Sequence, residues 1–168
     1  MTNESTCCFT GPRPARLPEN GNENSTEIQN LKRAVRSAVF DAYYEGFRFF
    51  MSGMAEGFDL YAAETVLSMK QDFEGIALVA VLPYSGAPKH HSPEISKRID
   101  SILKNADLVL SLSEHYFSGC ELIRNKYMVD HSSRIIGYYN GLSNGTAHCW
   151  NYASEKDLEM VNIYENYD

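Results

Sequence analysis

Three glycine-containing turns carry the residue types best suited to binding an anion. They occupy residues 9–14, 51–59 and 139–146, where a hydrophobic strand is predicted to end and a helix to begin. Glycine allows positive φ and close approach of a ligand to the backbone, and a helix N-terminus offers free N–H groups and a partial positive charge. Because the carboxyl ends of parallel strands meet at one edge of a sheet, these turns predict a crevice for a phosphate-bearing, nucleotide-like ligand.

The first turn places a hydroxyl, a glycine and a guanidinium together. Thr10 can donate a hydrogen bond, Gly11 allows close approach, and Arg13 can bind a phosphate through two parallel hydrogen bonds. Prolines on both sides of Arg13 restrict the backbone around it. The alternative interpretation is a surface turn with a solvated arginine.

The second turn joins two glycines, spaced four residues apart, to an acidic helix start. Its predicted ligand contacts are Ser52, Gly53, Met54, Gly57 and Asp59. The spacing differs from the G-x-G-x-x-G fingerprint of dinucleotide-binding proteins. Asp59 is interpreted either as a ligand contact or as the cap of the next helix. Glu56 would repel a phosphate and suits a sugar hydroxyl or a water molecule better.

The third turn leads into the last predicted helix. Gly141 and Gly145 provide open backbone, and Thr146 provides a hydroxyl at the helix N-terminus, where a phosphate would bind. His148 and Cys149 are adjacent in this helix and therefore point apart. A Cys–His catalytic pair made of these two residues is not expected.

Three acidic residues and one polar helix stripe supply further candidates. Glu114 lies in a predicted loop at the same edge of the sheet and joins Glu56 and Asp59 as a candidate catalytic acid or base. Every third residue from Arg124 to Asp130 falls on one helical face. This stripe is interpreted as a ligand wall, a salt-bridged surface or a subunit contact.

The cysteines and histidines give no support for a metal site. Their spacing matches no zinc motif, so neither a metal nor another cofactor is expected. Cys7 and Cys8 are neighbours in a predicted strand and point to opposite faces, which favours reduced thiols over disulfides. The N-terminal residues lack the basic and apolar regions of a signal peptide, and we expect a cytoplasmic protein.

The composition indicates one acidic domain. The 168 residues suit a single domain over residues 1–168. The net charge of −7 disfavours a nucleic-acid partner, because nonspecific binding to a phosphate backbone usually needs a basic face. No apolar run approaches the roughly 18 residues of a membrane span, so no membrane partner is expected.

Apolar runs alternate with amphipathic segments along the chain. Strands are predicted at residues 6–10, 47–52, 76–83, 108–112, 134–139 and 160–164. Helices are predicted between them, with capping boxes of Thr26 with Gln29 and of Ser118 with Glu121 and a cap at Ser92. This alternation predicts a three-layer α/β/α domain with a mostly parallel sheet of five to six strands. Residues 12–25 form a long loop of the kind that is usually functional or disordered.

Together these segments resemble the YpsA-type branch of the SLOG superfamily, which is related to DprA and to the LOG enzymes. The similarity rests on residues 7–14, 52–59, 62–64, 124–132 and 145–147. It includes Arg124 and Asn125, which we count among the ligand-binding residues. The resemblance implies a Rossmann-like fold, a homodimer, and a pocket for a nucleotide or derivative such as ADP-ribose or NAD in a sensor or regulator.

Two departures from these relatives bear on activity. Asn144 stands where relatives carry a glycine, and Cys149 stands where LOG-type enzymes carry a glutamate. A thiol cannot stabilise positive charge as a carboxylate does, so a LOG-like phosphoribohydrolase reaction is disfavoured. Two alternatives to a binding protein stay open. One is a hydrolase that cleaves an N-glycosidic or phosphoester bond, and the other is a protein-interaction module with a vestigial pocket.

Overall fold

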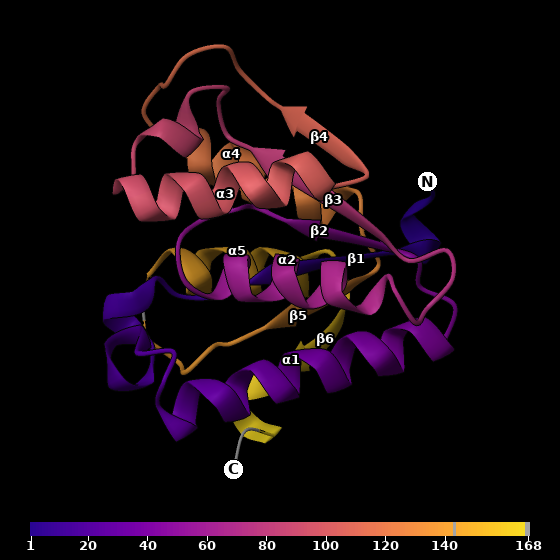
Figure 1. Ribbon diagram of the computed structural model, residues 1–168. Helices are drawn as coiled ribbons and strands as arrows, with labels where there is room; N and C mark the ends of the chain where they lie inside the picture. The colour runs from indigo at the N-terminus through magenta and orange to yellow at the C-terminus, as the bar shows by residue number, and fades with distance from the viewer. Residues whose placement is uncertain (143, 167–168) are drawn as a thin grey trace.

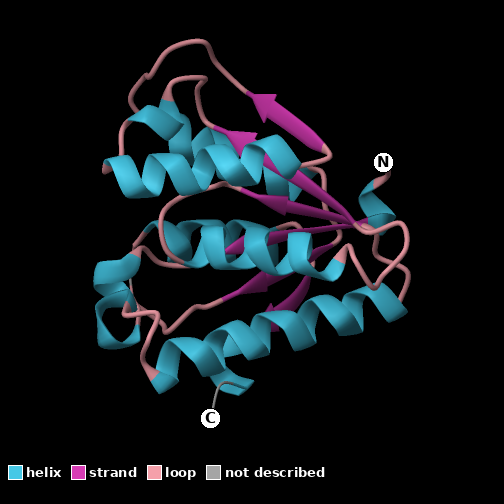
Figure 2. Ribbon diagram, viewed as in Figure 1, coloured by secondary structure: helices cyan, strands magenta, loops and turns pink. Residues whose placement is uncertain are grey.

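A parallel sheet with β1 near its centre organises the chain. The computed structural model describes residues 1–142 and 144–166. In this part of the chain, six strands run in the order β4-β3-β2-β1-β5-β6, and every neighbouring pair is parallel (Figures 1 and 2). The strands are β1 Thr6–Thr10, β2 Phe49–Ser52, β3 Ala77–Leu82, β4 Leu108–Ser111, β5 Arg134–Gly137 and β6 Glu159–Asn162.

Helices cover both faces of this sheet and complete three layers. Figure 1 shows α1, α2 and α3 on one face and α4 and α5 on the other. Cys7 belongs to the apolar core under the first group and Cys8 to the core under the second, so the predicted opposite orientation of these thiols is confirmed. The predicted Rossmann-like α/β/α fold is confirmed with these helices: α1 Thr26–Tyr44, α2 Phe58–Met69, α3 Pro93–Asn105, α4 Cys120–Asp130 and α5 Gly145–Glu155.

The helix starts agree only partly with the predicted caps. Ser92 caps α3 as expected, since its hydroxyl accepts a hydrogen bond from the Ile95 N–H at 3.3 Å. The Thr26 capping box is wrong by one residue, because Ser25 is the cap of α1. The Ser118 capping box is also wrong. Gly119 precedes α4 with φ of +87° and provides no side chain to accept a hydrogen bond.

The long segment between β1 and α1 is folded onto the helices. It contains the 3-10 turns Pro14–Arg16 and Pro18–Gly21, and it buries Leu17. Glu23 forms ion pairs with Lys32 of α1 at 2.6 Å and with Arg98 of α3 at 2.7 Å. These contacts fix the segment that follows Arg13 over the carboxyl end of β1.

None of the helices in the described residues has the length and apolar character needed to cross a bilayer.

Candidate functional site

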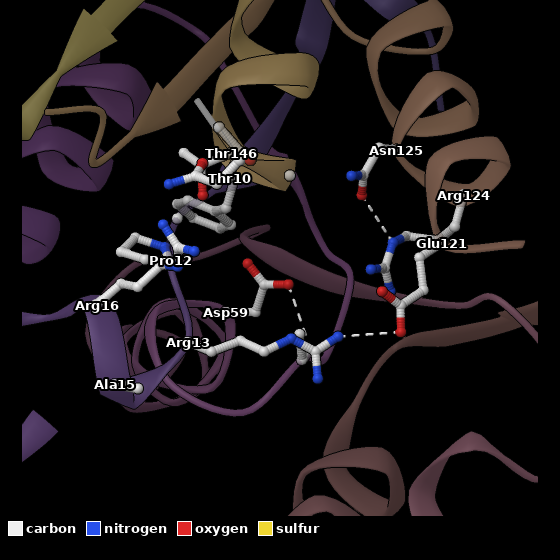
Figure 3. A pocket seen from close by; sticks show the side chains of 15 residues that line it. Thr10, Pro12, Arg13, Ala15, Arg16, Asp59, Glu121, Arg124, Asn125 and Thr146 are labelled. Atoms are coloured by element: carbon white, nitrogen blue, oxygen red, sulfur yellow. Dashed lines mark hydrogen bonds and ion pairs between the residues drawn. The ribbon is translucent and has the colours of Figure 1, made fainter. Parts of the chain in front are cut away.

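A cavity of about 520 Å³ lies at the carboxyl end of β1. This is where the strand order reverses, because β2, β3 and β4 continue on one side of β1 and β5 and β6 lie on the other. Doubly wound sheets bind ligands at this position, and the volume falls in the usual range of small-molecule sites. The predicted residues that line it are Thr10, Gly11, Arg13, Asp59, Arg124, Asn125, Gly145 and Thr146 (Figure 3).

The turn after β1 packs against α2 on one side and lines the cavity on the other. A Cβ atom at Gly11 would lie 2.2 Å from Cγ of Phe58, so no larger residue fits between the turn and α2. Thr10 is buried, and its hydroxyl forms a hydrogen bond with the thiol of Cys149. Glycine at position 11 is therefore required by the fold, and its backbone is at the same time open to a ligand.

Three arginines line the cavity. Arg13 is half exposed, and its Nη2 lies 3.0 Å from Oε1 of Glu121, also half exposed. Arg124 is buried; it donates to the carbonyl of Gly53, and its Nε donates to Oδ1 of Asn125 at 2.9 Å. Arg16, in the Pro14–Arg16 turn, is the third. The carboxyl groups of Asp59 and Glu121 also line the cavity, so its positive charges exceed its negative ones within an acidic protein.

Arg16 and Glu121 were not among the predicted site residues. The signal for Arg16 was present, since it is a second arginine three residues after Arg13 in the segment that leaves the central strand. Glu121 was interpreted only as part of a helix cap. In the structure, it occupies the first turn of α4 and holds Arg13 across the cavity (Figure 3).

Among the three candidate catalytic acids, Asp59 is the one that lines the cavity. It is buried in the first turn of α2, and its carboxylate accepts a hydrogen bond from the Ala55 N–H at 3.3 Å. Burial raises the pKa of Asp59 to about 6, although Arg124 and the Ala55 N–H act in the opposite direction. Its alternative role as the helix cap is wrong, because Gly57 holds the position before the helix.

The other predicted residues of the second turn build the turn and do not line this cavity. The Ser52 hydroxyl donates to the carbonyl of Asp59 at 2.9 Å and accepts from the Met54 N–H at 3.2 Å. Gly57 has φ of +99°, and a Cβ there would lie 2.8 Å from the carbonyl oxygen of Pro12. Gly53 and Met54 line a smaller neighbouring cavity of about 90 Å³. Their common effect is to position Asp59 and the β1 turn.

The N-terminus of α5 closes the cavity on the side of β5. Asn144 lines the cavity and caps the helix, since its Oδ1 accepts from the Ala147 N–H at 3.1 Å. Asn144 and Cys149, the two positions that depart from the relatives, thus have structural roles: Asn144 caps α5 and Cys149 is buried in the core. Burial raises the pKa of Cys149 to about 11, so this thiol is neutral at physiological pH and cannot replace a carboxylate. His148 is exposed while Cys149 is buried, which confirms that they do not form a pair.

Three predicted residues lie away from the cavity. Glu114 is exposed in the loop after β4. Glu56 faces His91, with 3.9 Å between Oε2 and Nδ1. Gly141 lies at a separate groove beside β6. The helix stripe also separates from the site after Arg124, because Asp130 accepts a hydrogen bond from the Tyr152 hydroxyl at 2.7 Å. Of the predicted catalytic acids, only Asp59 faces the cavity.

In the described ranges, no group of three or more His, Cys, Asp or Glu side chains is arranged to hold a metal ion.

Solved structures with the same fold include two DNA processing proteins. DprA of Streptococcus pneumoniae aligns with 94% of this chain and 49% of its own, with a TM-score of 0.64 and 17% identity. DprA of Helicobacter pylori, described with a single-stranded DNA binding mode, aligns with 95% and 64%, with a TM-score of 0.61 and 17% identity. The expectation that net charge disfavours a nucleic-acid partner is wrong, because a protein of this fold binds single-stranded DNA.

Sequence relatives come from bacteria. A UPF0398 protein of Halalkalibacterium halodurans is 27% identical over 119 residues, covering 70% of this chain and 63% of the relative. The prophage-derived protein YoqJ of Bacillus subtilis is 29% identical over 121 residues, covering 65% and 71%. The chain thus spans somewhat under two thirds of the length of the UPF0398 proteins that it matches.

The profile of the YpsA family, described as the YspA SLOG family, matches residues 7–166 and so nearly the whole chain. It includes the β1 turn, the Asp59 turn, α4 and the N-terminus of α5, which together surround the cavity. The chain therefore belongs to the YpsA family of SLOG proteins.

Proposed function

We propose that the cavity binds a phosphate-bearing nucleotide or nucleotide derivative, and that the protein acts as a sensor or regulator of that ligand. The observation that supports this most directly is the convergence of three arginines and the α5 N-terminus on one cavity at the reversal of strand order. Arginine and helix N-termini are both favourable partners for phosphate. ADP-ribose, NAD and AMP are ligands of this class.

A ligand phosphate can take the place of Glu121 as the ion-pair partner of Arg13. Both partners are half exposed, and an exposed ion pair contributes only about 0–1 kcal/mol. A phosphate can therefore replace Glu121 as the partner of Arg13 at small energetic cost. Arg124 is already hydrogen bonded to Gly53 and Asn125, so it contributes mainly through its charge.

The N-terminus of α5 provides a sharp test of this proposal. A Cβ at Gly145 would meet no atom within 4 Å, so substitutions are tolerated sterically. Gly145→Asp places a carboxylate where the phosphate is proposed to lie, and Gly145→Ala is the matched control. Calorimetry with ADP-ribose, NAD, AMP and a single-stranded oligonucleotide should detect binding to the Ala variant and at least tenfold weaker binding to the Asp variant. Equal binding to both variants would contradict the proposal.

Arg16 offers a second test, because its substitution removes a positive charge from the cavity and leaves the N-terminus of α5 unchanged. Arg16→Ala should weaken binding of the same ligands, whereas Arg33→Ala, which removes an exposed charge from α1, should not. Equal losses in the two variants would indicate general electrostatic attraction. If no ligand binds at any pH, the interpretation as an interaction module with a vestigial pocket is preferred.

A hydrolase is the second candidate, and Asp59 is the observation that favours it. A carboxyl group with a pKa of about 6 inside a ligand-sized cavity can donate or accept a proton near neutral pH. Chromatography of the nucleotides after incubation separates the two functions, because a binding protein returns them unchanged. Turnover that persists undiminished in Asp59→Asn excludes this residue as the acid or base.

We also propose that the protein works in the cytoplasm as a homodimer. Its four cysteines are free and buried, which fits a reducing compartment. The homodimer is an expectation from the family resemblance, and light scattering coupled to size exclusion tests it.

A further inference from the structure

A groove of about 750 Å³ lies at the carboxyl ends of β5 and β6, one strand nearer the sheet edge than the cavity. Its lining includes Tyr139, Trp150 and Tyr164, with the amides of Asn140 and Asn162 and the open backbone of Gly141. No charged side chain is found among the described residues of this lining. The groove therefore differs in character from the arginine-lined cavity.

The aromatic residues of the groove are held in place by specific contacts. The Oδ1 atom of Asn162 accepts hydrogen bonds from the N–H groups of Tyr139 and Tyr164, each at 3.1 Å. The Nδ2 atom of Asn162 donates to the carbonyl of Tyr139 at 2.9 Å. Trp150 lies over Gly137, where a Cβ would be 2.8 Å from Cζ3 of the indole. One amide and one glycine thus preorganise three aromatic residues.

We propose that this groove binds an unpaired nucleobase of a nucleotide joined by phosphodiester linkage to the one in the cavity. The rings of Tyr139 and Trp150 are both partly exposed, with centroids 5.9 Å apart and planes inclined by 38°. Aromatic side chains of this kind stack on bases of any sequence. A neutral, aromatic lining suits a base, as the arginines of the cavity suit a phosphate.

The chain connects the two sites directly. Tyr139, Asn140 and Gly141 line the groove, and Asn144, Gly145 and Thr146 of the same segment line the cavity. Gly137 of β5 pairs with Thr10 of the cavity on one side and with Asn162 of the groove on the other. The two sites are therefore two strand spacings apart, roughly 10 Å, which a short single strand can span. The proposal rests on the proposed function for the phosphate subsite, but the base subsite can be tested separately. It also gives a role to Gly141, which was predicted to bind ligand and lies outside the cavity.

Trp150 is the only tryptophan in the chain and reports on the groove. The probe is 5′-phosphorylated tetradeoxyadenylate, and its control is an abasic strand of equal length and charge. We expect the adenylate strand to quench the tryptophan fluorescence and the abasic strand to leave it unchanged.

A pair of tyrosine variants tests the groove independently of the fluorescence. Tyr139→Leu, which keeps apolar volume without the ring, should weaken binding of the adenylate strand on the order of tenfold. Tyr116→Leu, which removes an exposed tyrosine from the loop after β4, should not weaken it.

The outcomes distinguish failure of the groove from failure of the cavity. If the adenylate strand binds and Gly145→Asp weakens it, but Trp150 is not quenched and Tyr139→Leu has no effect, the base subsite is wrong and the phosphate site stands. If Trp150 is quenched and Tyr139→Leu weakens binding while Gly145→Asp has no effect, the base subsite stands and the proposed phosphate site is wrong. Equal binding of the abasic and adenylate strands overturns the base subsite.

Discussion

Arg124 of α4 offsets part of the unfavourable burial of Asp59 in α2. The carboxyl of Asp59 is surrounded by protein, and this burial is the largest cause of its raised pKa, while the positive charge of Arg124 is the largest opposing effect. The two residues belong to helices on opposite faces of the sheet and face one cavity at its edge. The protonation state of the site therefore depends on residues from both faces of the sheet.

Removing either neighbouring arginine should raise the pKa of Asp59 above about 6, because each positive charge favours the ionised carboxylate. Arg124→Met should have the larger effect and Arg13→Ala the smaller one. Titration of the Asp59 carboxyl carbon by NMR measures both values. Since Arg124 is buried, circular dichroism must first show that its variant is folded; the exposed Arg13 variant keeps the prediction testable if it is not. A lower pKa in either folded variant would contradict this account.

Ligand affinity should fall as the pH rises through about 6. Above this pH, Asp59 is ionised and its negative charge repels a phosphate in the same cavity. ADP-ribose is the suitable ligand for this measurement, because its pyrophosphate does not change charge in this range. Calorimetry across the range should show the decline for the wild-type protein and a flat profile for Asp59→Asn. A decline of equal size in that variant would assign the pH dependence to another group.

The sequence predicted the sheet and the edge at which the cavity lies because both depend on local patterns. Continuous apolar runs identified strands such as β3, and glycine turns identified the ends of β1 and β2. The prediction was less successful for the turn that contains Gly53 and Gly57. Those glycines accommodate Arg124 and the Pro12 carbonyl, which are tertiary neighbours that no local spacing indicates.

The roles of the acidic residues were harder to predict for the same reason. Glu56 and Asp59 lie three residues apart in one turn, yet only Asp59 is buried in the cavity. Glu121 looked like part of a helix cap and instead pairs with Arg13, more than a hundred residues earlier in the chain. The direction of a side chain at these turns depends on tertiary packing, which only the structure provides.

Gly57→Ala should destabilise the protein more than Gly46→Ala does. Both glycines have positive φ, +99° and +105°, so each substitution incurs backbone strain of roughly 1–3 kcal/mol. At Gly46 the new methyl group meets nothing within 4 Å, whereas at Gly57 it would lie 2.8 Å from the Pro12 carbonyl oxygen. The difference between the two free energies of unfolding, measured in urea, therefore reports the tighter surroundings of Gly57, where the two turns are in contact. Equal losses in the two variants would mean that this contact relaxes freely.

The segment between β1 and α1 should become less firmly held in acid. Interaction with Arg98 and then Lys32 lowers the pKa of Glu23 to about 2 from the ordinary 4.5. A lowered folded-state pKa contributes stability that is present above the unfolded value and is lost as the pH falls from about 4.5 towards 2. Glu23→Gln removes this contribution, so its urea midpoint should depend less on pH in that window than the wild-type midpoint does. Glu19→Gln changes an exposed carboxyl in the same segment and should leave the wild-type slope intact. If both variants show the wild-type slope, the ion pairs of Glu23 do not hold the segment that carries Arg13 and Arg16.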